Sequence, residues 1–303
     1  MDAVFWIVDF IIMKTIDPAQ LGARAFYRYM TAAVAPRPIA FASTVDAAGN
    51  VNLSPFSFFN FMGIDPPILV FAPNRRGRDH SHKDTALNLF EVPEVVINMV
   101  NYDMVQQMSL SSAEFERGVN EFAKAGFTML PSEVVKPPRV AESPAQFECK
   151  VLEIKEIGTM VMVIAQVLRA HFSESILDES GQIDQTRTDW VSRMGSDWYA
   201  RASGDALFEV PRPQYGIGVD ALPQSVRASK ILTGNNLGQL GSLTVFPTED
   251  EIEEYGRTET MRLLREEARL GCQYLPDLLH DHAQKLLDEG KISKALLTLL
   301  QER

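Results

Sequence analysis

The chain of 303 residues contains few cysteines, which removes several classes of protein from consideration. Its two cysteines, Cys149 and Cys272, lie far apart and form no CxxC pair. Small folds that are held together by disulfides, and zinc sites built from closely spaced Cys and His, are therefore not indicated. We expect a protein of the reducing cytoplasm.

The chain also lacks an excess of positive charge and a long apolar run. Its net charge of −11 argues against binding to nucleic acid, which requires a basic surface. The apolar stretch Val4–Met13 is too short to span a membrane, and no basic segment precedes it as in a signal peptide. Residues 1–12 are either an upstream mis-start, with Met13 as the true start, or a buried strand or packing arm. No membrane association is expected.

Standard catalytic motifs are missing as well. The sequence contains no P-loop, no HExxH and no GxSxG. Gly216-Ile-Gly218 lacks the third glycine of the dinucleotide-binding fingerprint. Neither a nucleophile with its own base nor a separate dinucleotide-binding domain is therefore indicated.

Short apolar runs separated by turn residues are present instead, and they predict a mainly β domain with helical insertions. A helix is expected over 19–30, with Asp17 as its N-cap, and another from Lys83 to Pro93. The predicted strands cover 39–45, 51–61 with an interruption at Pro55, 68–72, 95–100, 146–154 and 159–171.

The composition changes after Pro213. Residues 214–247 show no clear period, and Thr248 with Glu251 forms a capping box before a helix. Leucines between 275 and 300 form an amphipathic stripe that Gly290 interrupts, typical of an oligomerisation or core-packing element. We therefore expect an N-terminal arm over 1–24, a barrel domain over 25–213, and an irregular linker with an amphipathic helical tail over 214–303.

Two polar segments of the first half are the candidates for a binding site. Around Pro55, short side chains and unpaired backbone N–H groups could meet a ring edge or a phosphate, although an ordinary solvated edge strand has the same residues. From Arg75 to Thr85, a cationic loop leads into a helix whose N-terminus is suited to an anion. A plain N-cap in a solvated basic loop is the alternative. His80 and His82 in this loop are either a metal pair or polar filler.

Short blocks of this region occur in an order that is typical of one protein family. They are PRPIAFAST from Pro36 to Thr44, GNVNLSPFSFFN from Gly49 to Asn60, Pro66-Pro67, and Lys83-Asp-Thr85. With these residues the chain resembles the flavin-reductase-like, FMN-binding split-barrel proteins, and most of all the reductase components of two-component flavin monooxygenases. The similarity continues through 120–126, 137–139, 142–144 and 147–150, and covers roughly 25–213.

The resemblance implies a homodimeric split β-barrel, an α+β fold that is mainly β, with FMN bound near the subunit interface and no metal. Along the isoalloxazine ring and ribityl chain it places Ser43, Thr44, Asn52, Leu53, Ser54, Phe56 and Ser57. Around the phosphate it places Arg76, Lys83, Asp84 and Thr85. His171 is the candidate for a histidine beside the flavin, with an ordinary surface histidine as the alternative.

The resemblance also suggests the reaction. An NAD(P)H:flavin oxidoreductase would pass a hydride from the nicotinamide to flavin N5, with backbone N–H groups near Ser54–Ser57 stabilising the growing negative charge. Such a protein needs no catalytic residue of its own, and it could serve as a monooxygenase component. Two alternatives remain: an FMN-bound electron carrier or oxidoreductase with another acceptor, and a non-enzymatic flavin-binding or assembly protein.

Overall fold

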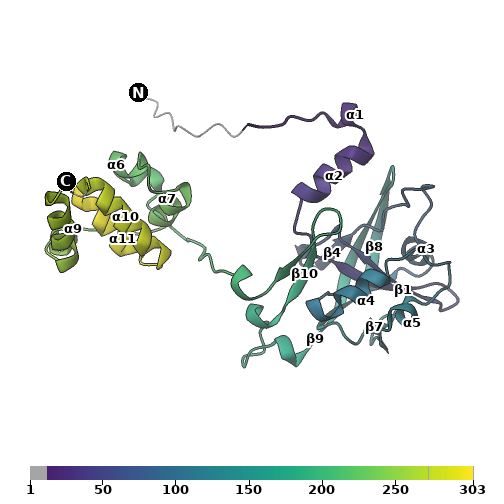
Figure 1. The fold of residues 1–303 in the computed structure, drawn as a ribbon. Helices are drawn as coiled ribbons and strands as arrows, with labels where there is room; N and C mark the ends of the chain where they lie inside the picture. Colours follow the sequence, from purple (N-terminus) through teal and green to yellow (C-terminus); the bar gives the residue numbers. More distant parts are fainter. Residues whose placement is uncertain (1–11, 272, 303) are drawn as a thin grey trace. The chain divides into compact units, whose positions relative to one another are not determined.

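The computed structural model describes residues 12–271 and 273–302, so most of the proposed mis-start lies outside the described residues. The chain divides into two compact units, which are described separately below. The barrel unit is Lys14–Phe208, and the tail unit is formed mainly by the residues from Glu209 onward. Figure 1 colours the barrel unit purple to green and the tail unit green to yellow. Within the described residues, no helix combines the length and apolar character needed to cross a bilayer.

The barrel unit is built on a seven-stranded antiparallel sheet in the order β2-β1-β5-β8-β9-β4-β3. Its strands are β1 Ala40–Val45, β2 Val51–Phe56, β3 Phe59–Ile64, β4 Pro67–Phe71, β5 Glu94–Asn98, β8 Ala145–Ile157 and β9 Met160–Phe172. Two small hairpins join β6 Met129–Leu130 to β7 Arg139–Val140, and β10 Trp190–Arg193 to β11 Tyr199–Ala202. Each predicted strand region thus contains extended chain.

The sheet must be rolled up, because its two edge strands follow one another in the sequence. Only Ser57 and Phe58 separate β2 from β3. A flat sheet would place these strands about 29 Å apart, at about 4.8 Å for each of six spacings. The connection spans at most about 11 Å, since each residue step covers about 3.8 Å or less. The two edges of the sheet therefore meet near Ser57, where the barrel is split.

This closure corrects the expected strand over 51–61. The run is two strands that pair with different neighbours, β2 with β1 and β3 with β4. The predicted helix over 19–30 is likewise divided into α1 Pro18–Leu21 and α2 Ala23–Ala33, because Gly22 adopts a φ of 82°. Asp17 does cap α1, accepting the Ala19 N–H at 2.9 Å.

The two faces of the β1–β2 hairpin pack into different cores, as expected from the alternation of side chains along a strand. Helix α3 Asp84–Glu91 contributes Leu89 to the inner core, together with Ala42 and Phe56. Helices α4 Val105–Leu110 and α5 Glu121–Ala125 cover the other face. Cys149 is completely buried in the inner core, and burial raises the pKa of its thiol to about 12, so it is not a nucleophile.

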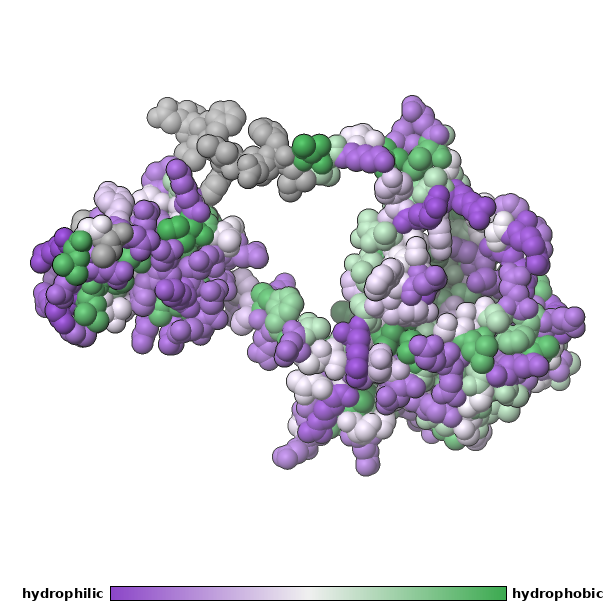
Figure 2. Space-filling model, viewed as in Figure 1, coloured by the Kyte–Doolittle hydropathy of each residue, from purple (hydrophilic) through white to green (hydrophobic). Residues whose placement is uncertain are grey.

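The tail unit has a hydrophobic core of its own. Its helices are α6 Gln224–Arg227, α7 Gly234–Gly241, α8 Glu249–Gly256, α9 Glu259–Arg269, α10 Leu275–Asp288 and α11 Ile292–Leu299. Short 3-10 helices of the tail unit occur at Val219–Ala221 and Leu300–Glu302, and those of the barrel unit at Tyr102–Met104, Glu174–Ile176, Gln185–Arg187 and Gly204–Ala206. The predicted capping box of Thr248 and Glu251 is present, and Gly290 separates α10 from α11. The view in Figure 2 shows a mostly hydrophilic tail surface with small, separate apolar areas.

The segment 214–247 is not irregular as expected, because it contains α6 and α7. Helix α7 has three glycines, which have a low helix propensity. The sequence therefore did not indicate a helix here. It is stabilised by a capping box of Thr233 and Asn236 and by the burial of Leu237 and Leu240 in the tail core.

Candidate functional site

The β1–β2 hairpin and the start of α3 bring the two predicted binding segments together. The Thr85 hydroxyl donates to Asn52 Oδ1 at 2.7 Å, and both side chains are buried. One turn further along α3, Asn88 Nδ2 donates to Thr44 Oγ1 at 3.2 Å. These bonds fix the N-terminus of α3 against the hairpin.

Lys83 directly precedes α3, and its ammonium group lies 5.1 Å from the centre of the Phe56 ring. Burial lowers the pKa of Lys83, and the nearby Arg76 guanidinium lowers it further. No described residue forms a hydrogen bond or an ion pair with this ammonium group. A half-buried cation without an anionic partner is costly, which suits it to an incoming anion.

The three arginines of the same loop differ from Lys83, because each has a carboxylate partner. Arg75 pairs with Glu156 at 2.9 Å. Arg78 contacts Glu114 at 3.2 Å. Arg76 lies 3.3 Å from Asp84 Oδ2 and also donates to the His82 carbonyl. Lys83 is therefore the cation of this loop that is best placed to receive an external anion.

The first turn of α3 offers free backbone donors. The N-cap residue Lys83 makes no side-chain capping bond. The N–H groups of Asp84, Thr85 and Ala86 have no hydrogen-bond partner among the described residues. Orphan N–H groups at a helix N-terminus, together with the helix dipole, favour a bound phosphate. Arg76 offsets the Asp84 carboxylate there, so the donor set fits a phosphate group.

The other predicted residues divide between the two faces of the hairpin. Ser43 and Leu53 are paired across the strands and completely buried on the face of α4 and α5, where the Ser43 hydroxyl donates to the Pro138 carbonyl. Ser54 and Ser57 are half-buried, and neither side chain has a hydrogen-bond partner within the described chain. Ser54 and Ser57 therefore retain free hydroxyl groups, whereas Ser43 does not.

The unpaired backbone N–H groups expected beside Pro55 are fewer than predicted. In an edge strand, alternate residues turn their backbone groups away from the neighbouring strand. In β2 the Leu53 N–H points outward, but it donates to Glu121 Oε2 at 2.9 Å. Pro55 has no N–H to offer. The Ser57 N–H, just beyond β2, has no partner among the described residues.

Glu121 is a site residue that the sequence analysis did not identify. It begins α5, is only 6% exposed, and accepts a hydrogen bond from Asn52 Nδ2 at 2.9 Å. Together with Asn52 and Asp84 it lines a small hollow. It lies within the block 120–126 that carries the family resemblance, but nothing in its local pattern distinguishes it from a solvated first-turn carboxylate.

The His171 side chain contacts two carboxylates rather than standing free. Its Nε2 lies 2.8 Å from Glu148 Oε1, and its Nδ1 lies 4.0 Å from Glu133. Burial favours a higher pKa for Glu148, but hydrogen bonds from the Glu133 and Val134 N–H groups and from His171 outweigh it and lower the pKa. His82 is similarly occupied, 2.7 Å from Glu156. Over 12–271 and 273–302, no cluster of three or more acidic, His or Cys side chains could hold a metal ion.

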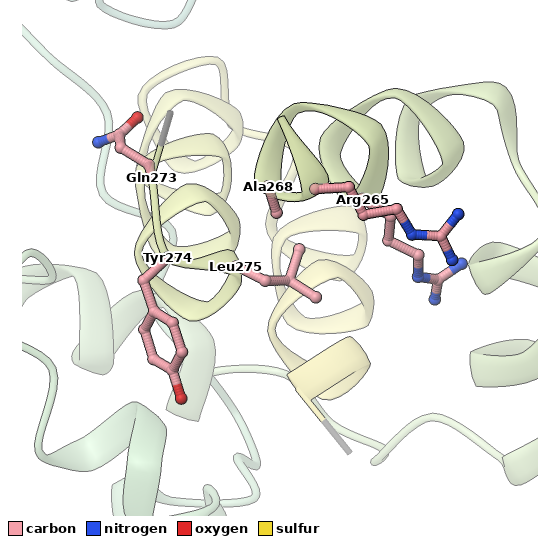
Figure 3. Close-up of a pocket in the computed structure, with 6 residues that line it drawn as sticks. Arg265, Ala268, Gln273, Tyr274 and Leu275 are labelled. Carbon is pink, nitrogen blue, oxygen red and sulfur yellow. The ribbon is translucent and has the colours of Figure 1, made fainter. Parts of the chain in front are cut away.

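The tail unit has a surface hollow between α9 and α10, which Figure 3 shows. The Arg265 guanidinium at this hollow donates to the Gly256 carbonyl at 2.6 Å and to Gln301 Oε1 at 3.0 Å. It therefore connects parts of the tail core. None of the predicted site residues lines the hollow.

Comparison with known proteins identifies the class of protein that this barrel and site define. The family model described as "Flavin reductase like domain" matches residues 32–187, and the chain belongs to this family. The predicted resemblance and split-barrel fold are thereby confirmed. The family is one of flavin-dependent oxidoreductases, so the cofactor is a flavin.

Individual relatives cover the same part of the chain. An uncharacterised protein of Aquifex aeolicus is 34% identical over 203 residues, which are 67% of this chain and 100% of that protein. The structure of Pseudomonas fluorescens 2-nitrobenzoate 2-nitroreductase NbaA has a TM-score of 0.59 and 30% identity, covering 65% of this chain and 96% of that one. Nitrilotriacetate monooxygenase component B from Bacillus cereus has a TM-score of 0.61 and 27% identity, covering 65% and 98%.

Proposed function

We propose that the protein is an FMN-dependent NAD(P)H:flavin oxidoreductase with the FMN phosphate at the N-terminus of α3. The observation that carries this proposal is the Lys83 ammonium group, which makes no hydrogen bond or ion pair with a described residue and lies beside free N–H groups of the first helical turn. Membership of the flavin reductase like family supports a flavin as the ligand.

The site residues have different roles in this proposal. Lys83 and the first-turn N–H groups bind the phosphate, while Arg76 neutralises Asp84 beside it. Ser54 and Ser57 lie toward the ribityl chain and the ring, whereas Phe56 is 5% exposed and belongs to the inner core beside the Lys83 ammonium group. Asn52, Thr85, Ser43, Thr44 and Leu53 are buried, and they hold the hairpin and helix in place rather than contacting the ring.

When bound, FMN supplies the redox chemistry by accepting a hydride from NAD(P)H. The chain itself orients the ligand and contributes donors such as the free Ser57 N–H and hydroxyl, which can stabilise negative charge on the ring. No general acid or base is required of the protein. His171, paired with Glu148, therefore has no catalytic role in this proposal.

Two candidates can be named for the final electron acceptor. The likeness to a monooxygenase component B supports transfer of reduced flavin to a monooxygenase partner. The 30% identity to a 2-nitrobenzoate 2-nitroreductase supports direct reduction of a small organic acceptor as the second candidate function. The free, buried thiol of Cys149 supports a cytoplasmic location for either reaction.

We further propose a homodimer that forms through β3. This edge strand has no charged residue, and Phe61, Met62 and Ile64 are 54%, 65% and 85% exposed. An exposed, uncharged edge is suited to a second copy of the chain. Sedimentation velocity should give twice the mass of one chain, and a species of 33.9 kDa at all concentrations would contradict the dimer.

Anaerobic mixing of the FMN-loaded protein with NADH or NADPH tests the proposed reaction. We expect at least one of them to bleach the flavin absorbance. If both fail while FMN is bound, the protein is not a nicotinamide-dependent reductase, and dithionite-reduced protein should then be tested with nitroaromatic acceptors. A protein that neither purifies with flavin nor binds added FMN would refute the site itself.

A further inference from the structure

The Glu121 carboxylate is the buried titratable group nearest to the proposed site whose role the proposed function does not explain. The N-cap of α5 is the preceding residue, Asn120, whose Oδ1 accepts the Phe122 N–H at 2.9 Å. Both carboxylate oxygens of Glu121 accept bonds from β2, Oε1 from Asn52 Nδ2 and Oε2 from the Leu53 N–H, each at 2.9 Å. Glu121 thus connects α5 to the edge of β2.

This contact determines the orientation of the Asn52 amide. A carboxylate can only accept hydrogen bonds, so the NH₂ group of Asn52 must face Glu121. The amide oxygen then faces Thr85, whose hydroxyl must donate to it. The chain of hydrogen bonds therefore has one direction, from Thr85 through Asn52 to Glu121.

The direction of this chain has a consequence for the anion site. Thr85 is the second residue of α3, and its only hydroxyl proton is used by Asn52. It therefore cannot donate to a phosphate, and binding depends on Lys83 and the backbone N–H groups. Thr85 instead attaches the start of α3 to β2 and so holds these donors at a fixed place.

Keeping a carboxylate in this position is unfavourable, which indicates a role beyond covering a strand edge. Burial raises the pKa of Glu121, hydrogen bonds from Leu53 and Asn52 oppose this rise, and the Asp84 carboxylate adds to it. An edge strand can be protected more simply by a proline or a lysine.

We propose that Glu121 is a positioning residue that fixes the N-terminus of α3 against β2 through Asn52 and Thr85, and so sets the affinity for FMN. This inference rests on the proposed function, because it takes FMN as the ligand of that helix terminus. It adds a residue from α5 to a site otherwise built from the hairpin, the cationic loop and α3.

Exchanging the two polar groups tests the proposal. Glu121→Met removes both acceptors and leaves Asn52 Nδ2 and the Leu53 N–H without a partner. Asn52→Asp places two carboxylates face to face. Glu121→Gln alone is not disruptive, because the Asn52 amide can turn over and accept from the introduced NH₂. Glu121→Met and Asn52→Asp should each weaken FMN binding by about tenfold to a hundredfold, the usual effect of one unsatisfied buried polar group.

The double variant, Glu121→Gln with Asn52→Asp, restores a complete set of donors and acceptors. The introduced glutamine can donate to the introduced aspartate and still accept the Leu53 N–H, while the aspartate accepts the Thr85 proton. We expect the affinity of the double variant to return to within about threefold of the unmodified protein, a much smaller loss than Asn52→Asp alone causes.

The measurements are FMN fluorescence quenching for affinity and thermal unfolding of the FMN-free protein for folding. Glu116→Met is the matched control, because it makes the same chemical change at an exposed position. If the unmodified protein binds FMN but Glu121→Met binds it equally well, Glu121 has no positioning role and the proposed function stands. The same holds if the double variant folds but binds no better than Asn52→Asp. If the unmodified protein binds no FMN, the proposed function and this inference both fail.

Discussion

Replacing Lys83 with alanine should raise the dissociation constant for FMN by about tenfold to a hundredfold, which corresponds to about 1.5–3 kcal/mol for a hydrogen bond to a charged group. The ammonium group is half-buried and has no ion-pair partner among the described residues, so the substitution breaks no ion pair and removes only its contact with the Phe56 ring. The affinity can be measured by quenching of FMN fluorescence. Lys150→Ala, which removes an exposed lysine of β8, is the control and should leave the affinity unchanged.

The pH dependence of binding distinguishes the charge of Lys83 from its packing. Because burial and Arg76 lower the pKa of Lys83, its ammonium form is lost at a lower pH than in an exposed lysine. The affinity for FMN should therefore fall as the pH rises through this lowered pKa. Lys83→Arg keeps the charge over this range and should not show the decrease. Unchanged affinity in Lys83→Ala would place the phosphate elsewhere.

Replacing His280 with alanine should destabilise the tail unit by about 1–3 kcal/mol, the usual cost of leaving a buried hydrogen-bonding group without its partner. His280 is 6% exposed on α10, where Nδ1 lies 2.6 Å from Ser229 Oγ and Nε2 contacts the Glu302 carboxylate. The Ser229 oxygen also accepts the N–H groups of Ile231 and Leu232. The three side chains thus form a structural connection rather than a nucleophile with its base.

The two-unit organisation allows this loss to be observed separately. In the described chain the tryptophans, Trp190 and Trp198, belong to the barrel unit, whereas α6 to α11 belong to the tail. Trp6 lies outside the described residues and is replaced by phenylalanine in all proteins compared, so that the fluorescence reports the barrel unit. His280→Ala should shift the helical circular-dichroism transition to lower temperature without an equal shift in tryptophan fluorescence. His282→Ala, two residues away on the same helix and half-buried, is the control. Coincident shifts of both signals would show that the units unfold together.

Local signals in the sequence predicted local structure well. The Asp17 cap, the Thr248 and Glu251 capping box and the Gly290 interruption depend on residues within a few positions of one another, and all three are present. The helix after Lys83 is also confirmed, because its signal combines a start, an apolar face and a stop at Pro93. The family resemblance identified the cofactor class from blocks of the same kind.

Non-local contacts could not be predicted in this way. The sequence does not indicate that β2 and β3 lie at opposite edges of one sheet, because this depends on the order of all seven strands. Glu121 acquires its role from Asn52, which lies 69 residues earlier in the chain. The partner of His171 is Glu148 on the neighbouring strand, so its pairing is also not visible in its local pattern.

The two edge strands differ in chemistry, so one edge of the sheet is better suited to self-association than the other. Along β2, Pro55 removes one outward donor and Glu121 occupies another, so a foreign strand cannot add there in register. β3 has neither a proline nor, among the described residues, a carboxylate bonded to its outward N–H groups, and its apolar side chains face solvent. If the chain is overproduced or partly unfolded, aggregation should therefore begin at β3, leaving the β2 edge beside the proposed cofactor site unpaired.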